Sequence, residues 1–190
     1  LLQWAPPSPM AALELLDWKF SDEIVRAYAV RLLNGLTDGD LSDVLLQLVN
    51  IVKYEPYHDS PLARFLLSRA LRNRLVIGHP LYWLLKAELH TAVERLGLLL
   101  EAYLRGCVVG TATLIKIEDN IIKGLNQVAE TVRQTKKEER EEVVQYELRK
   151  LYFPPRFQLP LFSDRESSGL QLPNCKHMKS KKVPLWLVFS

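Results

Sequence analysis

The stretch from Lys53 to His90, KYEPYHDSPLARFLLSRALRNRLVIGHPLYWLLKAELH, decides the fold because it has the pattern of two amphipathic helices joined by a turn. Ser60 followed by Pro61 is typical of a helix start. The serine caps the first turn, and the N–H that proline lacks would have no partner within the helix at this position. Gly78 closes the turn and is expected to adopt a backbone angle that other residues resist. One such hairpin cannot bury both of its apolar faces, so neighbouring helices are expected on each side. The apolar face is expected at Leu62, Phe65, Leu66, Arg69 and Leu71 in the first helix, and at Tyr82, Leu85, Leu89 and Val93 in the second.

The rest of the chain up to residue 152 also has helical periodicity. The segment Asp22–Val30 has the pattern Asp-x-x-Val-Arg-x-x-Ala-Val of HEAT-like repeats, in which the aspartate caps a turn and the arginine lies over a neighbouring hairpin. Ser21 is the predicted N-cap of this helix. Helix pairs recurring at roughly 35–45 residues predict an all-α fold, a right-handed superhelix of antiparallel hairpins. The further helices are expected at residues 10–16, 38–53, 118–133 and 135–152, with 91–117 forming one long helix or two joined near 106–110, and the 38–53 helix has an apolar stripe at Leu41, Val44, Leu45, Leu48, Val49 and Val52.

The character of the sequence changes at Phe153, where prolines, a polar patch and a basic cluster precede an apolar run. This composition predicts a linker followed by a strand. The expected domains are a helical domain at 1–152, an extended linker at 153–175 and the start of another domain at 176–190. Because the chain begins at Leu1 without a methionine and stops at Ser190 inside the apolar run, we expect an internal piece of a longer protein.

Composition narrows the function classes. The 190 residues are 48% hydrophobic with a net charge of +3, which is too mild to predict a nucleic-acid partner. The two cysteines, Cys107 and Cys175, lie far apart and outside any Cys/His cluster, which favours a reduced, intracellular chain over a disulfide-stapled one. The sequence does not open with a signal-peptide pattern. It also contains no uninterrupted run of about 18 apolar residues, the length that would predict a membrane span.

The candidate chemical groups in the helical part mostly have structural interpretations. The run from Lys136 to Glu142, KKEEREE, is interpreted as a solvated helix face, with a docking surface as the alternative. Tyr82 and Trp83 are interpreted as core aromatics. The sequence contains no phosphate-binding glycine loop, nucleophile elbow or paired catalytic carboxylates, so residues 1–152 alone predict a binding or scaffolding module. The four histidines, which show no metal-ligand spacing and are expected to be structural or on the surface, are His58, His79, His90 and His177.

The C-terminal tail offers a second possibility. Basic residues and Ser180 precede the strand predicted at Val183–Phe189, and such a turn can contact phosphate through charge and hydrogen-bond donors. Composition alone predicts only a solvated basic turn here. The basic residues are Lys176, Lys179, Lys181 and Lys182.

Several segments together resemble the helical domain and the first kinase-lobe strands of phosphoinositide 3-kinases. They are ALELLDWKFSDEIVRAYAVRLL, KYEPYHDSPLARFLLSRALRN, IGHPLYWLLKAE, LLLEAYLRGC and CKHMKSKKVPLWLVF, in the family's order and spacing. The resemblance covers essentially the whole chain. EPYHDS and EAYLRGC are most similar to the gamma-type, class IB catalytic subunit, and the likeness extends to class I as a whole.

The resemblance implies an ATP-dependent lipid kinase that phosphorylates the 3-hydroxyl of membrane phosphoinositides and uses Mg²⁺. It implies a helical scaffold that contacts the Ras-binding, C2 and kinase domains, a regulatory or adaptor subunit, and a cytoplasmic protein recruited peripherally to the plasma membrane. In the segment similar to the family's CKxMxSKxxPLWL, the adenine side of the ATP pocket would be lined by Met178, Pro184 and Trp186, with Ser180 near the phosphates and Lys181 as a further phosphate contact.

Some features depart from the family pattern. The segment RNRLVIGH has one extra residue, Pro80 stands where the family has an aromatic residue, and Lys179 stands where related sequences have a small one. The strand lysine, the DRHxxN-like loop and the DFG aspartate would all follow Ser190, so this stretch is expected to be non-catalytic alone. The alternatives are a non-catalytic helical adaptor derived from such a kinase, and a class II or class III lipid kinase.

Overall fold

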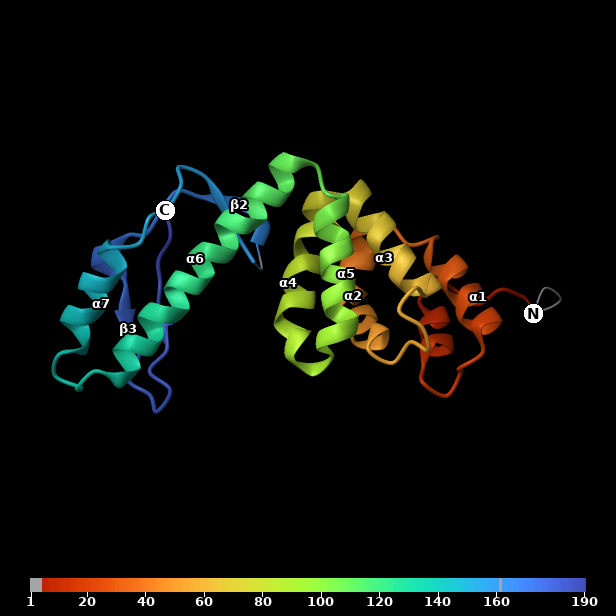
Figure 1. The fold of residues 1–190 in the computed structure, drawn as a ribbon, viewed down its shortest axis with the longest axis horizontal. Coiled ribbons are helices and arrows are strands. Elements are labelled where there is room, and N and C mark those ends of the chain that lie inside the picture. Colours follow the sequence, from red (N-terminus) through yellow and green to blue (C-terminus); the bar gives the residue numbers. More distant parts are fainter. Residues whose placement is uncertain (1–4, 161) are drawn as a thin grey trace. The chain divides into compact units, whose positions relative to one another are not determined.

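The computed structural model describes residues 5–160 and 162–190 and divides the chain into two compact units, Leu1–Val108 and Val109–Ser190 (Figure 1). Most of the described residues are helical, and short strands occur only in the second unit of the described chain. The predicted all-α class, with a few short strands after the helices, is therefore confirmed. Within the described residues, no helix combines the length and apolar character needed to cross a bilayer.

The first unit is a layered array of helices in which α3 packs against α1, α2 and α5, and α4 packs against α2 and α5. Figure 1 shows α4 and α5 lying alongside each other in this unit. The stripe predicted for the 38–53 helix is confirmed, because all six of its apolar side chains are buried. The helices are α1 (Glu23–Leu33), α2 (Asp38–Val52), α3 (Pro61–Arg72), α4 (His79–Glu88) and α5 (Val93–Gly106), with 3₁₀ turns at Ala11–Leu16 and Leu89–Thr91 and a π-helical turn at Arg74–Gly78.

Two helix starts were predicted from their capping residues, and the structure supports one of them. Ser60 caps α3 by accepting a hydrogen bond from the Ala63 N–H at 3.2 Å. The prediction of Ser21 as the cap of α1 is wrong, because the Asp22 carboxylate accepts from the N–H groups of Ile24 and Val25. Asp22 is one residue closer to the first turn, so its short side chain reaches the two free amides.

Gly78 does not adopt the unusual backbone angle that its position in the turn predicted. Its φ is −67°, and the chain passes through a π-helical turn directly into α4. The glycine is required by a close approach instead. A Cβ here would lie 2.6 Å from the carbonyl oxygen of Ala70 and would also overlap the hydroxyl of Tyr103.

The predicted apolar faces of α3 and α4 hold in part. Leu62, Phe65, Leu66, Arg69, Tyr82 and Leu85 are buried, as expected. Leu71 is 44% exposed and Val93 is 65% exposed, so their assignment to the core is wrong; Leu89 is half-buried. Val93 is exposed because α4 ends at Glu88 and Val93 begins α5, so one helical face does not continue through both. Leu71 is two residues beyond Arg69 on α3, which places it on the opposite side of that helix. Tyr82 is a core aromatic, whereas Trp83 is only half-buried.

The second unit begins near the helix break that was one of the two alternatives for residues 91–117, since α5 ends at Gly106 and α6 begins at Val109. The boundary predicted between residues 117 and 118 is wrong, because α6 is continuous to Gln134. Its core joins α6 and α7 to the C-terminal strands through residues such as Leu125, Val144 and Val183. β1 pairs with β2 and β3 pairs with β4, both antiparallel. The elements are α6 (Val109–Gln134), α7 (Arg140–Arg149), β1 (Phe157–Leu159), β2 (Phe162–Ser167), β3 (Lys176–His177) and β4 (Leu185–Trp186), with a 3₁₀ turn at Leu172–Asn174.

The packing in the second unit differs from the predicted organisation of this part of the chain. The segment 153–175 was expected to be an extended linker, but it contains the β1–β2 hairpin, and β1 packs on α6. α7, which comes before residue 152, also packs on β3, which comes after it, and both belong to the unit Val109–Ser190. The KKEEREE run is only half helical, because 136–139 form the exposed turn before α7. The domain limits 1–152, 153–175 and 176–190 stay predictions.

Candidate functional site

The β3–β4 hairpin brings the apolar candidate residues of the tail to one face. Lys176 pairs with Trp186, and the Met178 N–H donates to the carbonyl oxygen of Pro184 at 2.8 Å. Since successive side chains of a strand point to opposite faces, Lys176, Met178, Pro184 and Trp186 share one side of the hairpin. All four are exposed, with Met178 at 46% and Trp186 at 51%. We call this surface, made of these four residues, the outer face of the hairpin.

The turn that links the two strands is compact and carries three exposed lysines. Its backbone is fixed by the Ser180 N–H, which donates to Met178 O at 2.9 Å, and by the Val183 N–H, which donates to Ser180 O at 3.2 Å. Within the described part of the chain, the N–H groups of Lys181 and Lys182 have no acceptor. Exposed amides beside lysine ammonium groups form the kind of turn that binds phosphate oxygens.

Val183 is the strained point of this turn. Its φ is +48°, a conformation that is unfavourable for a β-branched residue. The side chain is nevertheless buried, and it packs in the cluster that includes Val144 and Leu148 of α7. The core of the unit therefore holds the turn in a conformation that the local sequence disfavours.

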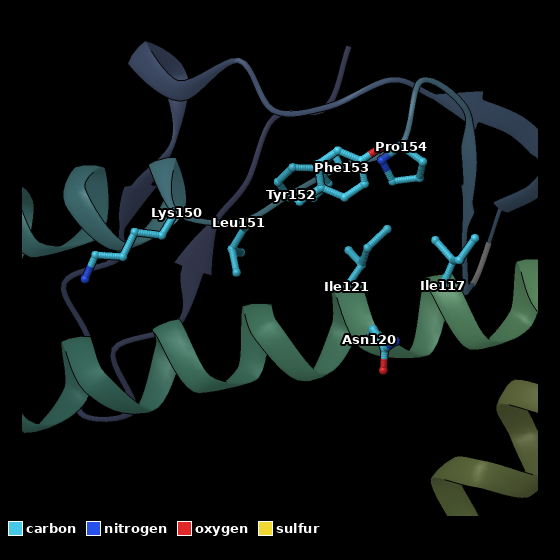
Figure 2. Close-up of a pocket in the computed structure, with 8 residues that line it drawn as sticks. All are labelled: Ile117, Asn120, Ile121, Lys150, Leu151, Tyr152, Phe153 and Pro154. Atoms are coloured by element: carbon cyan, nitrogen blue, oxygen red, sulfur yellow. The ribbon is translucent and has the colours of Figure 1, made fainter.

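A separate apolar pocket lies between α6 and the segment that follows α7 (Figure 2). Its volume is about 390 Å³. Lys150 is at its edge, and its ammonium donates to Glu147 at 2.7 Å, a hydrogen bond that raises the pKa of Lys150. None of the tail candidates lines this pocket. Its lining residues are Ile117, Asn120, Ile121, Lys150, Leu151, Tyr152, Phe153 and Pro154.

The histidines of the described chain do not form a metal centre. Across residues 5–160 and 162–190, no three His, Cys, Asp or Glu side chains lie close enough together to hold a metal ion. His79 is buried beside Trp83, whose indole N–H donates to its Nε2 at 3.2 Å. His177, on β3, faces Glu141 of α7, with 3.1 Å between Nδ1 and the carboxylate.

The five residues predicted to contact ATP thus lie on one hairpin, although they do not all occupy one face. Met178, Pro184 and Trp186 are on the outer face, while Ser180 and Lys181 belong to the exposed turn. Their role in binding a nucleotide stays a prediction. The position of Lys176 on the same face as Trp186 was not predicted, because only the strand register shows that these two residues pair.

Comparison with known proteins decides the family. A model described as "Phosphoinositide 3-kinase family, accessory domain (PIK domain)" matches residues 1–116. The chain belongs to the phosphoinositide 3-kinase family. Within this family it is 49% identical over 189 residues to phosphatidylinositol 3-kinase 2 of Dictyostelium discoideum, covering 98% of the chain and 10% of that relative. It is also 43% identical over 190 residues to phosphatidylinositol 3-kinase 1 of the same organism, covering 99% of the chain and 12% of the relative. The chain therefore spans about a tenth of the length of these phosphoinositide 3-kinases.

Proposed function

We propose that this chain is the helical scaffold and the first nucleotide-binding hairpin of a phosphatidylinositol 3-kinase catalytic subunit. That enzyme would transfer the γ-phosphate of ATP to the 3-hydroxyl of membrane phosphoinositides. The observation that carries the proposal is the outer face of the β3–β4 hairpin, where apolar side chains lie next to a lysine-rich turn. The two Dictyostelium relatives are both phosphatidylinositol 3-kinases, which supports the reaction class.

The hairpin has the chemistry that a nucleotide requires. The Met178 thioether, the Pro184 ring and the Trp186 indole are exposed on one side, where a flat purine could pack against them. The turn that follows Met178 offers backbone N–H groups and lysine ammonium groups to the phosphates. In this arrangement, adenine would lie along the strands and the phosphates would lie over residues 180–182.

Residues of this chain would position the nucleotide. Other groups would accept the proton of the lipid 3-hydroxyl and bind the metal ion. Mg²⁺ neutralises the charge on the transferring phosphate in this reaction. In the described residues, no three acidic or histidine side chains lie close enough together to hold this ion, so its ligands would come from other parts of the enzyme. We infer that the hairpin binds and orients ATP, while the lipid hydroxyl and the metal are handled by the rest of the enzyme.

We further propose the finer assignment that the sequence motifs imply. The protein would be a class I catalytic subunit, closest to the gamma type, whose helical unit contacts the Ras-binding, C2 and kinase domains and a regulatory subunit. It would be cytoplasmic and recruited to the plasma membrane, where the remaining lobe meets phosphoinositides. EPYHDS and EAYLRGC, both in the first unit, support the class.

The test is a lipid kinase assay on the full-length protein with Trp186→Ala. Loss of the indole should raise the KM for ATP about tenfold, because base–aromatic stacking is removed, while the KM for phosphoinositide should not change. Trp18→Ala is the matched control, since Trp18 is 75% exposed and lies in the first unit. Equal KM values for ATP in the two variants would contradict the proposal. A full-length protein that neither binds ATP nor phosphorylates lipid would favour a non-catalytic adaptor.

A further inference from the structure

The inner side of the β3–β4 hairpin is held by polar side chains of α7. The Gln145 side-chain amide donates two hydrogen bonds, to the carbonyl oxygens of Leu172 at 2.9 Å and of Cys175 at 2.8 Å. One turn earlier on the same helix, Glu141 faces His177 of β3. Residues four apart share one face of a helix, so a single face of α7 contacts the start of β3.

The two sides of β3 therefore have different partners. Cys175 and His177 point toward the helices, and Cys175 is buried in the core cluster. Lys176 and Met178 point to the outer face. Cys175 directly precedes β3 and Met178 directly follows it, so we expect a shift of the backbone at Cys175 to move the side chain of Met178 as well.

Gln145 fixes the backbone where β3 begins. The Leu172 carbonyl also accepts from the Cys175 N–H at 3.0 Å, so the glutamine joins both ends of the 3₁₀ turn that precedes the strand. The thiol of Cys175 in turn accepts from the Val188 N–H at 3.4 Å, which ties the same point to the chain after β4. One glutamine on α7 thus sets the position of both strands of the hairpin.

We propose that Gln145 is a positioning residue for nucleotide binding, acting through its two hydrogen bonds to the backbone at the start of β3. This inference rests on the proposed function of the hairpin. Gln145 does not reach the outer face and so does not touch the nucleotide. It holds the outer face in the conformation that the adenine requires, and a small misplacement of such a group is costly in rate or affinity.

The decisive variant is Gln145→Glu in the full-length protein. Glutamate has nearly the same shape, but its carboxylate cannot donate to the two carbonyl oxygens and is repelled by them. We expect the KM for ATP to rise roughly three- to tenfold, with kcat at saturating ATP changed less than twofold. Hydrogen exchange of the amides at 176–186 should become faster. Gln145→Lys, which restores a donor, should recover part of the loss.

The matched control is Gln127→Glu, the same charge change at an exposed position of α6. Unchanged KM and unchanged hairpin exchange in Gln145→Glu would overturn the inference. If Trp186→Ala still raised the KM for ATP in the same assay, the proposed function would stand although the inference about Gln145 had failed. If the full-length protein did not bind ATP at all, both the positioning role of Gln145 and the proposed function of the hairpin would be overturned.

A change confined to thermal stability would also overturn the positioning role. If Gln145→Glu lowered the melting temperature but left KM and kcat as in the unmodified protein, the glutamine would serve only the packing of α7 on the strands. The split between KM and kcat separates these outcomes, because a general loss of folded enzyme lowers kcat and leaves KM constant.

Discussion

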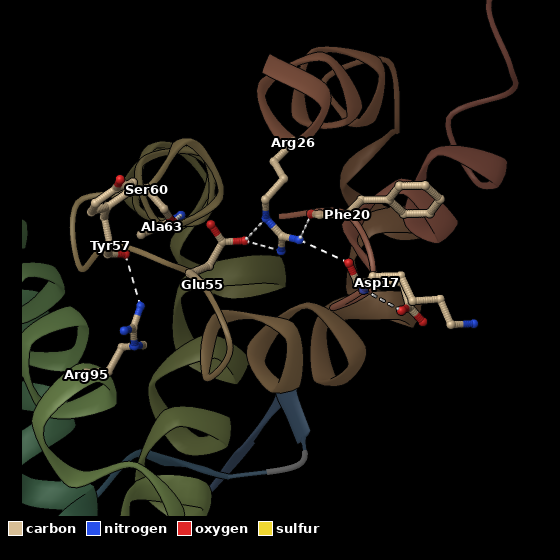
Figure 3. Close-up of polar contacts among 9 residues, drawn as sticks. Asp17, Phe20, Arg26, Glu55, Tyr57, Ser60, Ala63 and Arg95 are labelled. Atoms are coloured by element: carbon tan, nitrogen blue, oxygen red, sulfur yellow. Dashed lines mark hydrogen bonds and ion pairs between the residues drawn. The ribbon is translucent and has the colours of Figure 1, made fainter. Parts of the chain in front are cut away.

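The guanidinium of Arg26 on α1 forms a buried ion pair with Glu55 in the loop between α2 and α3, with Nε 3.0 Å from Oε1 (Figure 3). Both side chains are almost fully buried, with 4% and 2% of their surface exposed. Arg26 also donates to the carbonyl oxygens of Asp17 and Phe20, at 3.2 and 2.8 Å. One side chain therefore joins three segments of the first unit. The repeat pattern around Asp22 predicted only that this arginine lies over a neighbouring hairpin, and its contact with Glu55 between α2 and α3 agrees with that.

Removing one partner of this pair should destabilise the first unit strongly. Arg26→Met would leave the Glu55 carboxylate buried and unpaired, and breaking such a pair costs about 3–5 kcal/mol. Urea unfolding of the full-length protein, with hydrogen exchange used to report on α1–α3, measures the loss. Arg105→Met is the control, because the Arg105–Glu101 pair is exposed and should contribute less than about 1 kcal/mol. Similar losses in the two variants would contradict the importance of burial.

Asp38 should make the first unit sensitive to acid. Hydrogen bonds from Asn73 and Arg69 hold the pKa of the Asp38 carboxyl below its ordinary value of 3.8. A pKa that is lower in the folded state adds stability above the unfolded value, and this stability is lost as the pH falls through the folded value. The stability of α2 and α3 should therefore decline as the pH falls from about 4 toward 2.

The variant Asp38→Asn tests this acid dependence. It should be less stable than the unmodified protein at pH 7 and should lose less additional stability on acidification, as measured by urea midpoints at several pH values. Asp43→Asn changes an exposed aspartate of the same helix and should keep the acid response of the unmodified protein. If Asp38→Asn and the unmodified protein lost stability in parallel below pH 4, another group would be responsible.

Local patterns in the sequence predicted the helices well, because helix periodicity and caps depend on nearby residues. The apolar stripe of α2 and the Ser60 cap are both confirmed. Ser21 and Asp22 are both good capping residues; the repeat pattern pointed to the aspartate, and the observed hydrogen bonds decide for it. The same limit applies to Val93, whose exposure depends on where α4 ends and α5 begins.

The features that depend on distant contacts could not be predicted from periodicity. The segment after residue 152 has the prolines and polar residues of a linker, yet Phe157 is buried in the core of the second unit and its strand forms a hairpin. The role of Gln145 was equally hidden, since a glutamine in a charged helix is usually solvated. Its two acceptors lie 27 and 30 residues away in the chain.

Gly78→Ala should destabilise the junction of α3 and α4. The added methyl group would meet the Ala70 carbonyl at 2.6 Å and the Tyr103 hydroxyl, so backbone and side chain would have to shift. Overpacking of this kind costs about 1–3 kcal/mol. Gly97→Ala is the control within α5, because its methyl group would meet only Leu89 at an ordinary 3.7 Å. That variant should be more stable by about 0.5–1 kcal/mol, since alanine is the better helix former. Thermal unfolding with the same sign in both variants would contradict this account.

Leu66 and Leu71 lie on the same helix, and the structure predicts opposite tolerance to charge. Leu66 is fully buried, so Leu66→Asp would place an unpaired carboxylate in the core and should lower the stability of the first unit by several kcal/mol. Leu71→Asp changes a side chain that is 44% exposed and should cost about 1 kcal/mol or less. Hydrogen exchange of α3 in the full-length protein measures both effects under identical conditions. Equal protection of α3 in the two variants would mean that this helix faces its neighbours differently from the arrangement described above.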